Sequence, residues 1–236
     1  MVILNKAIIL SLRIVKSVDV HLKNLAFQGE WPNSTIGFMN KMEAQIPDRM
    51  PSERQPGFAD AAATSGMVIA GLFAVVVVGG LFHLSLPRFG IVPRTGSGLL
   101  GIIFSPLLHA SLKHVMANAV PLFVLLTILL MNPRYHPYRT LALIWTASGL
   151  GTWLVGRGHS VHIGASCIVF GLAAFLIVAG LVMKSWRSAA TAVFVAVVFG
   201  GIFYGVLPRA GPISWEGHLC GAAAGVWAAA RMRRRV

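Results

Sequence analysis

Long apolar runs, separated by short polar links, occupy most of the chain from residue 61 onward. A run of about 20 apolar residues is long enough to cross the hydrocarbon core of a bilayer as a helix. Six such runs can be distinguished, although the third and sixth are short for a span: 61–86, 102–131, 140–155, 165–183, 189–207 and 216–230. The pattern predicts an all-α membrane protein with a six-transmembrane-helix bundle over residues 61–230.

The first sixty residues have a different pattern. Apolar and basic positions from about residue 3 to 25 fall on opposite sides of a helix, which predicts an amphipathic helix on the inner leaflet, on the membrane domain or on another chain. Residues 28–57 contain four prolines among polar residues and are typical of a linker. We therefore expect a cytoplasmic N-terminal segment over 1–60 and a basic cytoplasmic tail over 231–236. No cleavage site typical of a signal peptide follows the first apolar stretch.

Composition supports the membrane assignment. The chain is 56% hydrophobic and only 11% charged, whereas soluble domains are about a quarter charged. This balance excludes a water-soluble globule and a disordered chain. Two cysteines are too few for a disulfide framework, and no zinc-ligand spacing is present, so no metal or other cofactor is expected.

The net charge of +13 raises the question of nucleic-acid binding, which the distribution of the cations argues against. The basic residues flank the apolar runs and form no continuous stripe, a pattern that sets the orientation of membrane proteins. On the side of the two termini lie Arg134, Arg139, Lys184, Arg187, Arg231, Arg233, Arg234 and Arg235. On the opposite side lie Arg88, Arg94, Arg157 and Arg209. The positive-inside rule then predicts a multi-pass protein of the cell (inner) membrane with both termini in the cytoplasm.

Polar side chains inside predicted spans are costly in lipid and mark candidate functional sites. Asn118 in the second run, Ser166 in the fourth and His218 in the sixth all lie near the outer ends of their helices. Small residues follow Ser166 and His218 at helical spacing, which predicts close packing of the fourth and sixth helices. If those faces meet, Ser166 and His218 lie within hydrogen-bond reach, the arrangement of an activated nucleophile.

Three motifs carry a resemblance to a known family. The segments are His109-x4-His114-x3-Asn118, Gly164-Ala165-Ser166-Cys167 and Gly217-His218-Leu219-Cys220-Gly221 continuing to Gly225. In this order, and on these runs, they resemble the motifs of the rhomboid intramembrane serine proteases of the bacterial six-helix type. The resemblance covers about residues 61–230.

The resemblance implies a mechanism and a substrate class. Ser166 would be the nucleophile and His218 the general base and acid of a dyad, with an oxyanion hole formed by His114, Asn118 and the Ser166 backbone N–H. His109, Gly164, Gly221 and Gly225 would support the site. The implied activity is cleavage of peptide bonds in or near transmembrane segments of other membrane proteins, without a cofactor, in a cavity open to the extracytoplasmic side. The 207–215 loop would cover it.

Two positions depart from the family's pattern. Cys167 replaces the last glycine of the G-x-S-G motif, and Leu100 and Gly101 stand where many members have a Trp-Arg pair in the first outer loop. Cys167 and Cys220 are expected to be small apolar fillers, and Phe170 a packing residue. His159 and His162, with His109 and His114, lack the partners that a metal site requires.

Two other functions remain open from the sequence. A non-catalytic relative would bind single-span clients without cutting them, and the replacement Cys167 is compatible with that alternative. A small channel or transporter would use the histidines as a proton path, although no inverted repeat is visible. The sequence does not indicate an oligomeric state.

Overall fold

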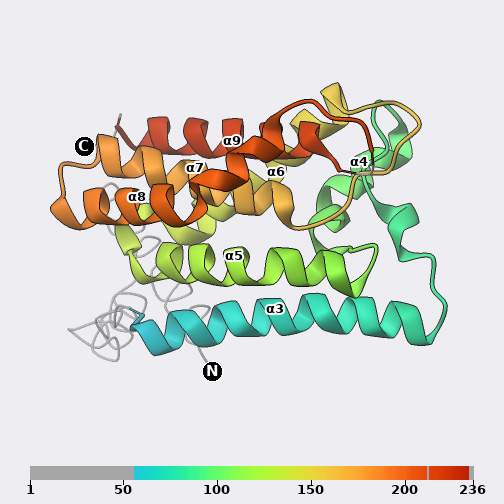
Figure 1. Ribbon diagram of the computed structural model, residues 1–236, viewed down its shortest axis with the longest axis horizontal. Helices are drawn as coiled ribbons and strands as arrows, with labels where there is room; N and C mark the ends of the chain where they lie inside the picture. The colour runs from blue at the N-terminus through green and yellow to red at the C-terminus, as the bar shows by residue number, and fades with distance from the viewer. Residues whose placement is uncertain (1–55, 212, 234–236) are drawn as a thin grey trace, which may run out of the picture. The chain divides into compact units, whose positions relative to one another are not determined.

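The computed structural model describes residues 56–211 and 213–233, and within them it is helical without a strand (Figure 1). The predicted all-α class is therefore confirmed for this part of the chain. Its α-helices are α3 (Phe58–Leu81), α4 (Gly96–Phe104), α5 (Leu112–Met131), α6 (Pro137–Val155), α7 (Ser166–Val182), α8 (Trp186–Phe199) and α9 (Trp215–Arg233). Four 3₁₀ turns connect them, η1 (Leu86–Phe89), η2 (Ser105–Leu107), η3 (Pro133–Tyr135) and η4 (Gly200–Val206).

Three segments of this bundle are long and apolar enough to cross a membrane: Phe58–Leu81, Leu112–Met131 and Trp186–Val206. The first is α3, the second is α5, and the third combines α8 with η4. The six-span topology and the cytoplasmic placement of the termini stay predictions. The amphipathic helix over 3–25, the proline-rich linker up to residue 55 and the last three residues of the basic tail lie outside the described residues.

The second apolar run differs from the prediction, because 102–131 is not one continuous span. Helix α4 ends at Phe104, and η2 and an extended link follow before α5 begins at Leu112. Pro106 lies in η2, and Ser111 caps α5 by accepting a hydrogen bond from the His114 backbone N–H at 3.2 Å. The hydropathy pattern joins the two helices into one run, although the polar residues His109, Ser111, Lys113 and His114 lie at the break. The break separates His109 from α5.

Helix α7 lies at the centre of the bundle and packs most extensively against α9. The predicted close approach of these two helices is confirmed by their glycines. A Cβ at Gly221 would overlap the Cys167 carbonyl, and one at Gly225 would overlap the Gly171 carbonyl. The two backbones are in contact because Gly171, Gly221 and Gly225 carry no side chain. This contact fixes the start of α9 beside the start of α7.

Substitution of Gly225 by alanine is expected to destabilise the bundle, because the added methyl group has no room against the Gly171 carbonyl. Overpacking of this kind costs about 1–3 kcal/mol. Thermal unfolding of the detergent-solubilised protein measures the effect, with Gly66→Ala as the matched control. Gly66 is also helical but has open space around its Cβ position, so that variant should keep the melting temperature. Equal melting temperatures for the two variants would contradict the tight packing of α7 on α9.

The segment between α3 and α5, which contains α4, is anchored without the Trp-Arg pair of the resembled family's pattern. Trp145 and Trp153 of α6 donate indole hydrogen bonds of 2.9 Å to the carbonyls of Ile102 and Thr95. Arg94 Nη1 donates to the carbonyls of Leu154 and Gly156, both at 2.9 Å. These bonds hold α4 against α6, so the absence of the pair at positions 100 and 101 does not leave the loop unattached.

Candidate active site

Ser166 and His218 come together where α7 and α9 begin. Ser166 is the first residue of α7, and His218 lies in the first turn of α9. The Ser166 Oγ and His218 Nε2 atoms are 2.9 Å apart, which is hydrogen-bond distance. Both side chains are half-buried, so the pair lies within the bundle and keeps part of its surface exposed.

The geometry around His218 selects one tautomer of its ring. Nδ1 lies 3.0 Å from the carbonyl oxygen of Gly205, which can only accept a hydrogen bond. Nδ1 therefore carries the proton of the neutral ring, and Nε2 is left to accept the hydroxyl hydrogen of Ser166. A backbone carbonyl thus orients the histidine, which is the function of the carboxylate in a serine-protease triad.

Phe170 fixes the plane of the same ring. Its side chain stacks on His218 with ring centroids 4.2 Å apart and an interplanar angle of 9°. A Cβ at Gly205 would lie 2.6 Å from the Phe170 ring, so the glycine allows both contacts. The sequence predicted packing for Phe170 and missed its contact with His218, although the spacing of four from Ser166 places both residues on one helix face. No pattern in the sequence indicated the carbonyl of Gly205.

His114 and Gly164 lie on the other side of Ser166. Gly164 has φ = 114°, a conformation that favours glycine, and a Cβ there would lie 2.7 Å from His114 Nε2. No described residue hydrogen-bonds the ring nitrogens of His114. Ser166 begins a helix, so its backbone N–H has no acceptor within α7. Two donors are thus available near Ser166 Oγ.

Asn118 and His109 form a supporting layer beside these donors. The Asn118 amide nitrogen lies 3.2 Å from His109 Nε2 and 3.2 Å from the His114 carbonyl, so both of its hydrogens are engaged. His109 Nε2 also accepts from the backbone N–H of Ala165 at 3.3 Å. In this geometry Asn118 and His109 hold Ala165, the residue before Ser166, against the first turn of α5.

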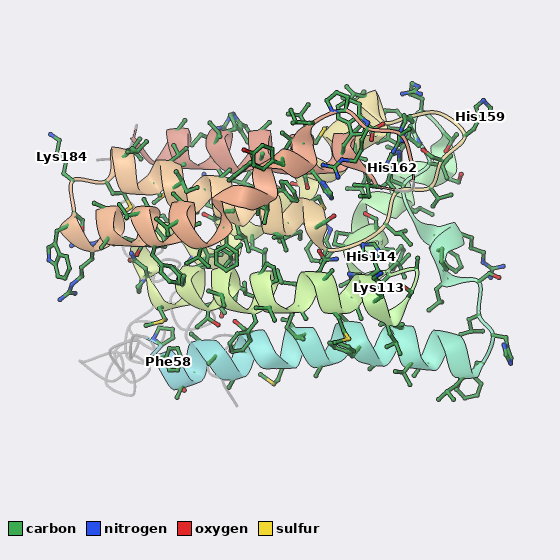
Figure 2. The ribbon with its side chains drawn as sticks, in the orientation of Figure 1. Phe58, Lys113, His114, His159, His162 and Lys184 are labelled. Atoms are coloured by element: carbon green, nitrogen blue, oxygen red, sulfur yellow. The ribbon has the colours of Figure 1, made fainter. Side chains whose placement is uncertain are left out.

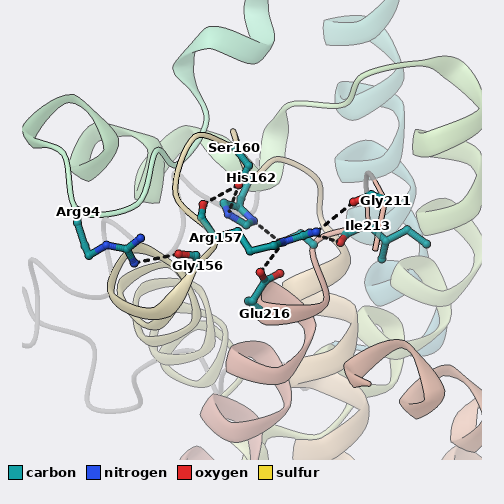
Figure 3. A network of polar contacts seen from close by, with 9 residues as sticks. Arg94, Gly156, Arg157, Ser160, His162, Gly211, Ile213 and Glu216 are labelled. Carbon is teal, nitrogen blue, oxygen red and sulfur yellow. Dashed lines mark hydrogen bonds and ion pairs between the residues drawn. The ribbon is translucent and has the colours of Figure 1, made fainter. Parts of the chain in front are cut away.

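A second polar network ties the 207–215 segment to the loop between α6 and α7 (Figure 3). Arg157 donates to the carbonyls of Gly211 and Ile213 at 3.2 and 2.6 Å and forms an ion pair with the buried Glu216, with Nε and Oε1 2.6 Å apart. His162 Nδ1 lies 2.6 Å from Ser214 Oγ. These contacts attach the 207–215 segment, which the sequence predicted as a cover, and the first turn of α9 to the α6–α7 loop. The sequence placed Glu216 on a different face from His218 but did not indicate Arg157 as its partner.

Breaking this network by Arg157→Met is expected to destabilise the protein. Leaving a buried carboxylate without its partner costs about 3–5 kcal/mol, less here because Arg157 is 37% exposed. The added change Glu216→Gln should restore most of the loss, because the uncompensated charge is removed. Thermal unfolding of the two single variants and the double variant gives the coupling. Independent, additive effects would contradict the pairing.

Of the remaining sequence candidates, His159 lies apart from the Ser166–His218 pair, whereas Cys167 directly follows Ser166 and Cys220 lies two residues after His218. His159 is exposed at the tip of the α6–α7 loop, away from His162 and from His114 (Figure 2). No described group of three or more His, Cys, Asp or Glu side chains could hold a metal ion. Cys167 and Cys220 are free and half-buried, and Cys167 Sγ lies 3.9 Å from the Gly164 carbonyl. Burial on one side of α7 is consistent with the predicted role of Cys167 as a filler.

Comparison with known proteins assigns the family. The family model of the Rhomboid domain matches residues 97–235, more than half of the chain. The chain belongs to the rhomboid family. Uncharacterized proteins of Mycobacterium tuberculosis and Mycobacterium bovis are 39% identical over 184 residues, covering 75% of this chain and 77% of each relative. An uncharacterized protein of Mycobacterium leprae is 39% identical over 170 residues, covering 68% of this chain and 67% of the relative.

No solved structure matches the chain. Rhomboid membership and the long apolar helices identify a membrane protein. The family's typical activity is intramembrane serine proteolysis, while the relatives found are uncharacterized. Whether this rhomboid cleaves peptide bonds therefore has to be argued from its own residues.

Proposed function

We propose that this rhomboid is an intramembrane serine endopeptidase that cleaves peptide bonds in or near the transmembrane segments of other membrane proteins. The proposal is carried by the 2.9 Å contact between Ser166 Oγ and His218 Nε2, with Nδ1 of the same ring held by the Gly205 carbonyl. Nothing in the packing of α7 on α9 requires a hydroxyl and an imidazole at this place, since the contact is made by glycines.

The first half of the reaction forms an acyl-enzyme. His218 Nε2 takes the Ser166 hydroxyl hydrogen while Oγ bonds to the substrate carbonyl carbon. The negative charge that develops on the carbonyl oxygen is stabilised by the Ser166 backbone N–H and an imidazole N–H of His114. The positive end of the α7 dipole lies at the same point and favours that charge. His218 then gives its proton to the leaving nitrogen as the carbon–nitrogen bond breaks.

The second half releases the product and restores the enzyme. A water molecule gives a proton to His218 Nε2 and its oxygen bonds to the ester carbon of the acyl-enzyme. The bond to Ser166 Oγ then breaks, and the oxygen recovers its hydrogen from His218. The part of the substrate that is cut must leave its helical conformation first, since a helix keeps its carbonyls in internal hydrogen bonds. The segment 207–215, held by Arg157, lies at the start of α9 and would have to allow this entry.

Cleavage by the purified full-length protein tests the function. A single-span membrane protein with small residues near the outer end of its helix is incubated with the rhomboid in detergent, and the products are mapped by mass spectrometry. We expect a cut in or near the span that is absent with Ser166→Ala and unchanged by a metal chelator. Binding of the substrate without any cleavage would favour a non-catalytic, client-binding rhomboid instead.

Acidification is expected to lower the rate. His218 can accept the Ser166 hydrogen only when its ring is neutral, so kcat/KM should fall with decreasing pH as Nε2 takes up a proton from solvent. The rate of substrate cleavage between about pH 5 and 8 measures this dependence. A rate that stays flat over that interval would be incompatible with His218 as general base.

A further inference from the structure

A cavity of about 560 Å³ lies at the end of the bundle opposite the Ser166–His218 pair. It is formed by η3, the first turn of α6, the link between α7 and α8, and the last turns of α9. The catalytic pair lies at the first residues of α7 and α9, and the cavity lies where these helices end. At about 1.5 Å per residue, the 17 residues of α7 separate the two sites by roughly 25 Å. Figure 2 shows Lys184, which lines the cavity, far from His114 and His162.

The charged side chains that line this cavity are all basic. Its cationic members come from all of the elements that form it, with a histidine between them: Arg134, Arg139, Lys184, Arg231 and His136. No aspartate or glutamate lines it. The described part of the chain holds only two carboxylates, Asp60, which accepts from the Gly57 backbone N–H, and Glu216, which pairs with Arg157 at the other end of α9.

The side-chain charges in the cavity are uncompensated within the described residues. Arg139 and Lys184 are exposed and have neither an ion pair nor a side-chain hydrogen bond there, and Arg134 is bonded only through its backbone. Arg231 stacks on Trp227 with Cζ 4.2 Å from the ring centroid, which holds its guanidinium near the cavity. Four like charges around one hollow repel one another, and an anion placed among them would relieve that repulsion.

Apart from Thr140 and Ser185, the rest of the lining is apolar. Leu143, Met183, Ala228 and Met232 contribute to the same cavity, so it offers an apolar wall next to the cations. A free phosphate ion would leave this wall without a partner. A phospholipid would contact both parts of the lining, with its phosphate on the cations and its acyl chains on the apolar wall. A basic end of the bundle would be enough to orient the chain in the membrane, but orientation does not require the cations to converge on a cavity.

We propose that this cavity binds the headgroup of an anionic phospholipid, with its phosphate among Arg134, Arg139, Lys184 and Arg231. Guanidinium groups can bind phosphate oxygens through paired hydrogen bonds, and the ammonium group of Lys184 adds a point charge. The first acyl carbons would lie on the apolar wall. Basic cavities between transmembrane helices at the membrane surface are suited to this class of ligand. The inference is independent of the proposed peptidase activity.

Native mass spectrometry of the full-length protein in detergent tests the proposal. The protein is titrated with phosphatidylglycerol and, separately, with phosphatidylcholine of the same acyl chains. We expect phosphatidylglycerol to bind about ten-fold tighter or more, since each cation near a membrane surface contributes measurably to the binding of anionic lipid. Equal affinities for the two lipids would overturn the proposal. The full chain is used because five further carboxylates lie in residues 1–55.

Matched variants locate the binding. The double variant Arg139→Gln/Lys184→Gln should bind phosphatidylglycerol about ten-fold more weakly, which corresponds to about 1.4 kcal/mol. Its affinity for phosphatidylcholine should be unchanged. Arg88→Gln/Arg187→Gln removes the same charge outside the cavity lining and should change neither affinity more than about two-fold. Equal losses in both double variants would show a general charge effect and overturn the proposal.

Two controls keep the outcome interpretable. Melting temperatures in detergent show whether the double variants fold, and the single variant Lys184→Gln, in an exposed link, replaces the cavity double variant if that one does not fold. Lys184→Gln should then lose a smaller part of the same affinity, and no loss would overturn the proposal. Inorganic phosphate at about 10 mM should not displace the lipid. Full displacement would assign the cavity to soluble phosphate and overturn the assignment to lipid.

Discussion

Replacement of either Ser166 or His218 by alanine is expected to lower the cleavage rate about 10⁴-fold or more, because each change removes the transfer of the hydroxyl hydrogen to Nε2. The two atoms are 2.9 Å apart, so neither residue can act without the other. The double variant should therefore be no slower than the slower single variant. Single-turnover cleavage of the same single-span substrate by each purified protein measures the three rates.

A second serine–histidine contact provides the control for this prediction. Ser160 Oγ lies 3.1 Å from His162 Nε2 in the α6–α7 loop, and it donates to the Arg157 carbonyl at 2.7 Å. No helix begins at Ser160, so this serine lacks the helix dipole that Ser166 has. Ser160→Ala should retain the rate within about ten-fold. Undiminished cleavage by Ser166→Ala would show that the proposed nucleophile is wrong.

The second large effect is expected for His114. Removal of its imidazole takes away one of two donors near the substrate oxygen, which lowers kcat about 100- to 1000-fold while substrate binding is largely kept. The ring nitrogens of His114 have no hydrogen bond from the described residues, and Gly164, with its φ of 114° and no side chain, lets the loop approach this ring. Comparison of kcat and KM for His114→Ala with those of the unchanged protein measures the effect.

Controls distinguish His114 from its neighbours. His159→Ala removes an exposed imidazole from the α6–α7 loop at the same end of the bundle and should leave kcat unchanged. Asn118→Ala should lower kcat by less than His114→Ala, because both Asn118 amide hydrogens are engaged by His109 and the His114 carbonyl. An effect of His114→Ala confined to KM, or a larger effect of Asn118→Ala, would show that the donor has been misassigned.

The sequence predicted the helices well and their connections poorly. Apolar runs show where a chain can be helical in lipid, so the class and five of the six runs agree with observed helices. The run 102–131 failed because its break depends on Pro106 and on the Ser111 cap, which hydropathy does not register. The contact of α7 with α9 was predictable, since only small residues at helical spacing allow backbones to touch.

The candidate site divides in the same way. Ser166 and His218 could be paired from the sequence, because a hydroxyl and an imidazole are costly in lipid and share a depth with glycine-rich faces. The group that orients His218, the Gly205 carbonyl, could not be found from the sequence. Every residue has a backbone carbonyl, and only the path of η4 brings this one to Nδ1 of His218. The Arg157–Glu216 ion pair joins residues far apart in the chain, and the sequence does not define the path of the loop that connects them.

Covalent labelling by a fluorophosphonate reports on the Ser166–His218 pair itself, because the reagent modifies a serine hydroxyl only when a neighbouring base activates it. We expect a single adduct, located at Ser166 by peptide mass spectrometry, that is lost in both Ser166→Ala and His218→Ala and kept in Ser160→Ala. Labelling of Ser166 that persists unchanged in His218→Ala, or an adduct on another serine alone, would contradict the pairing on which the proposed mechanism rests.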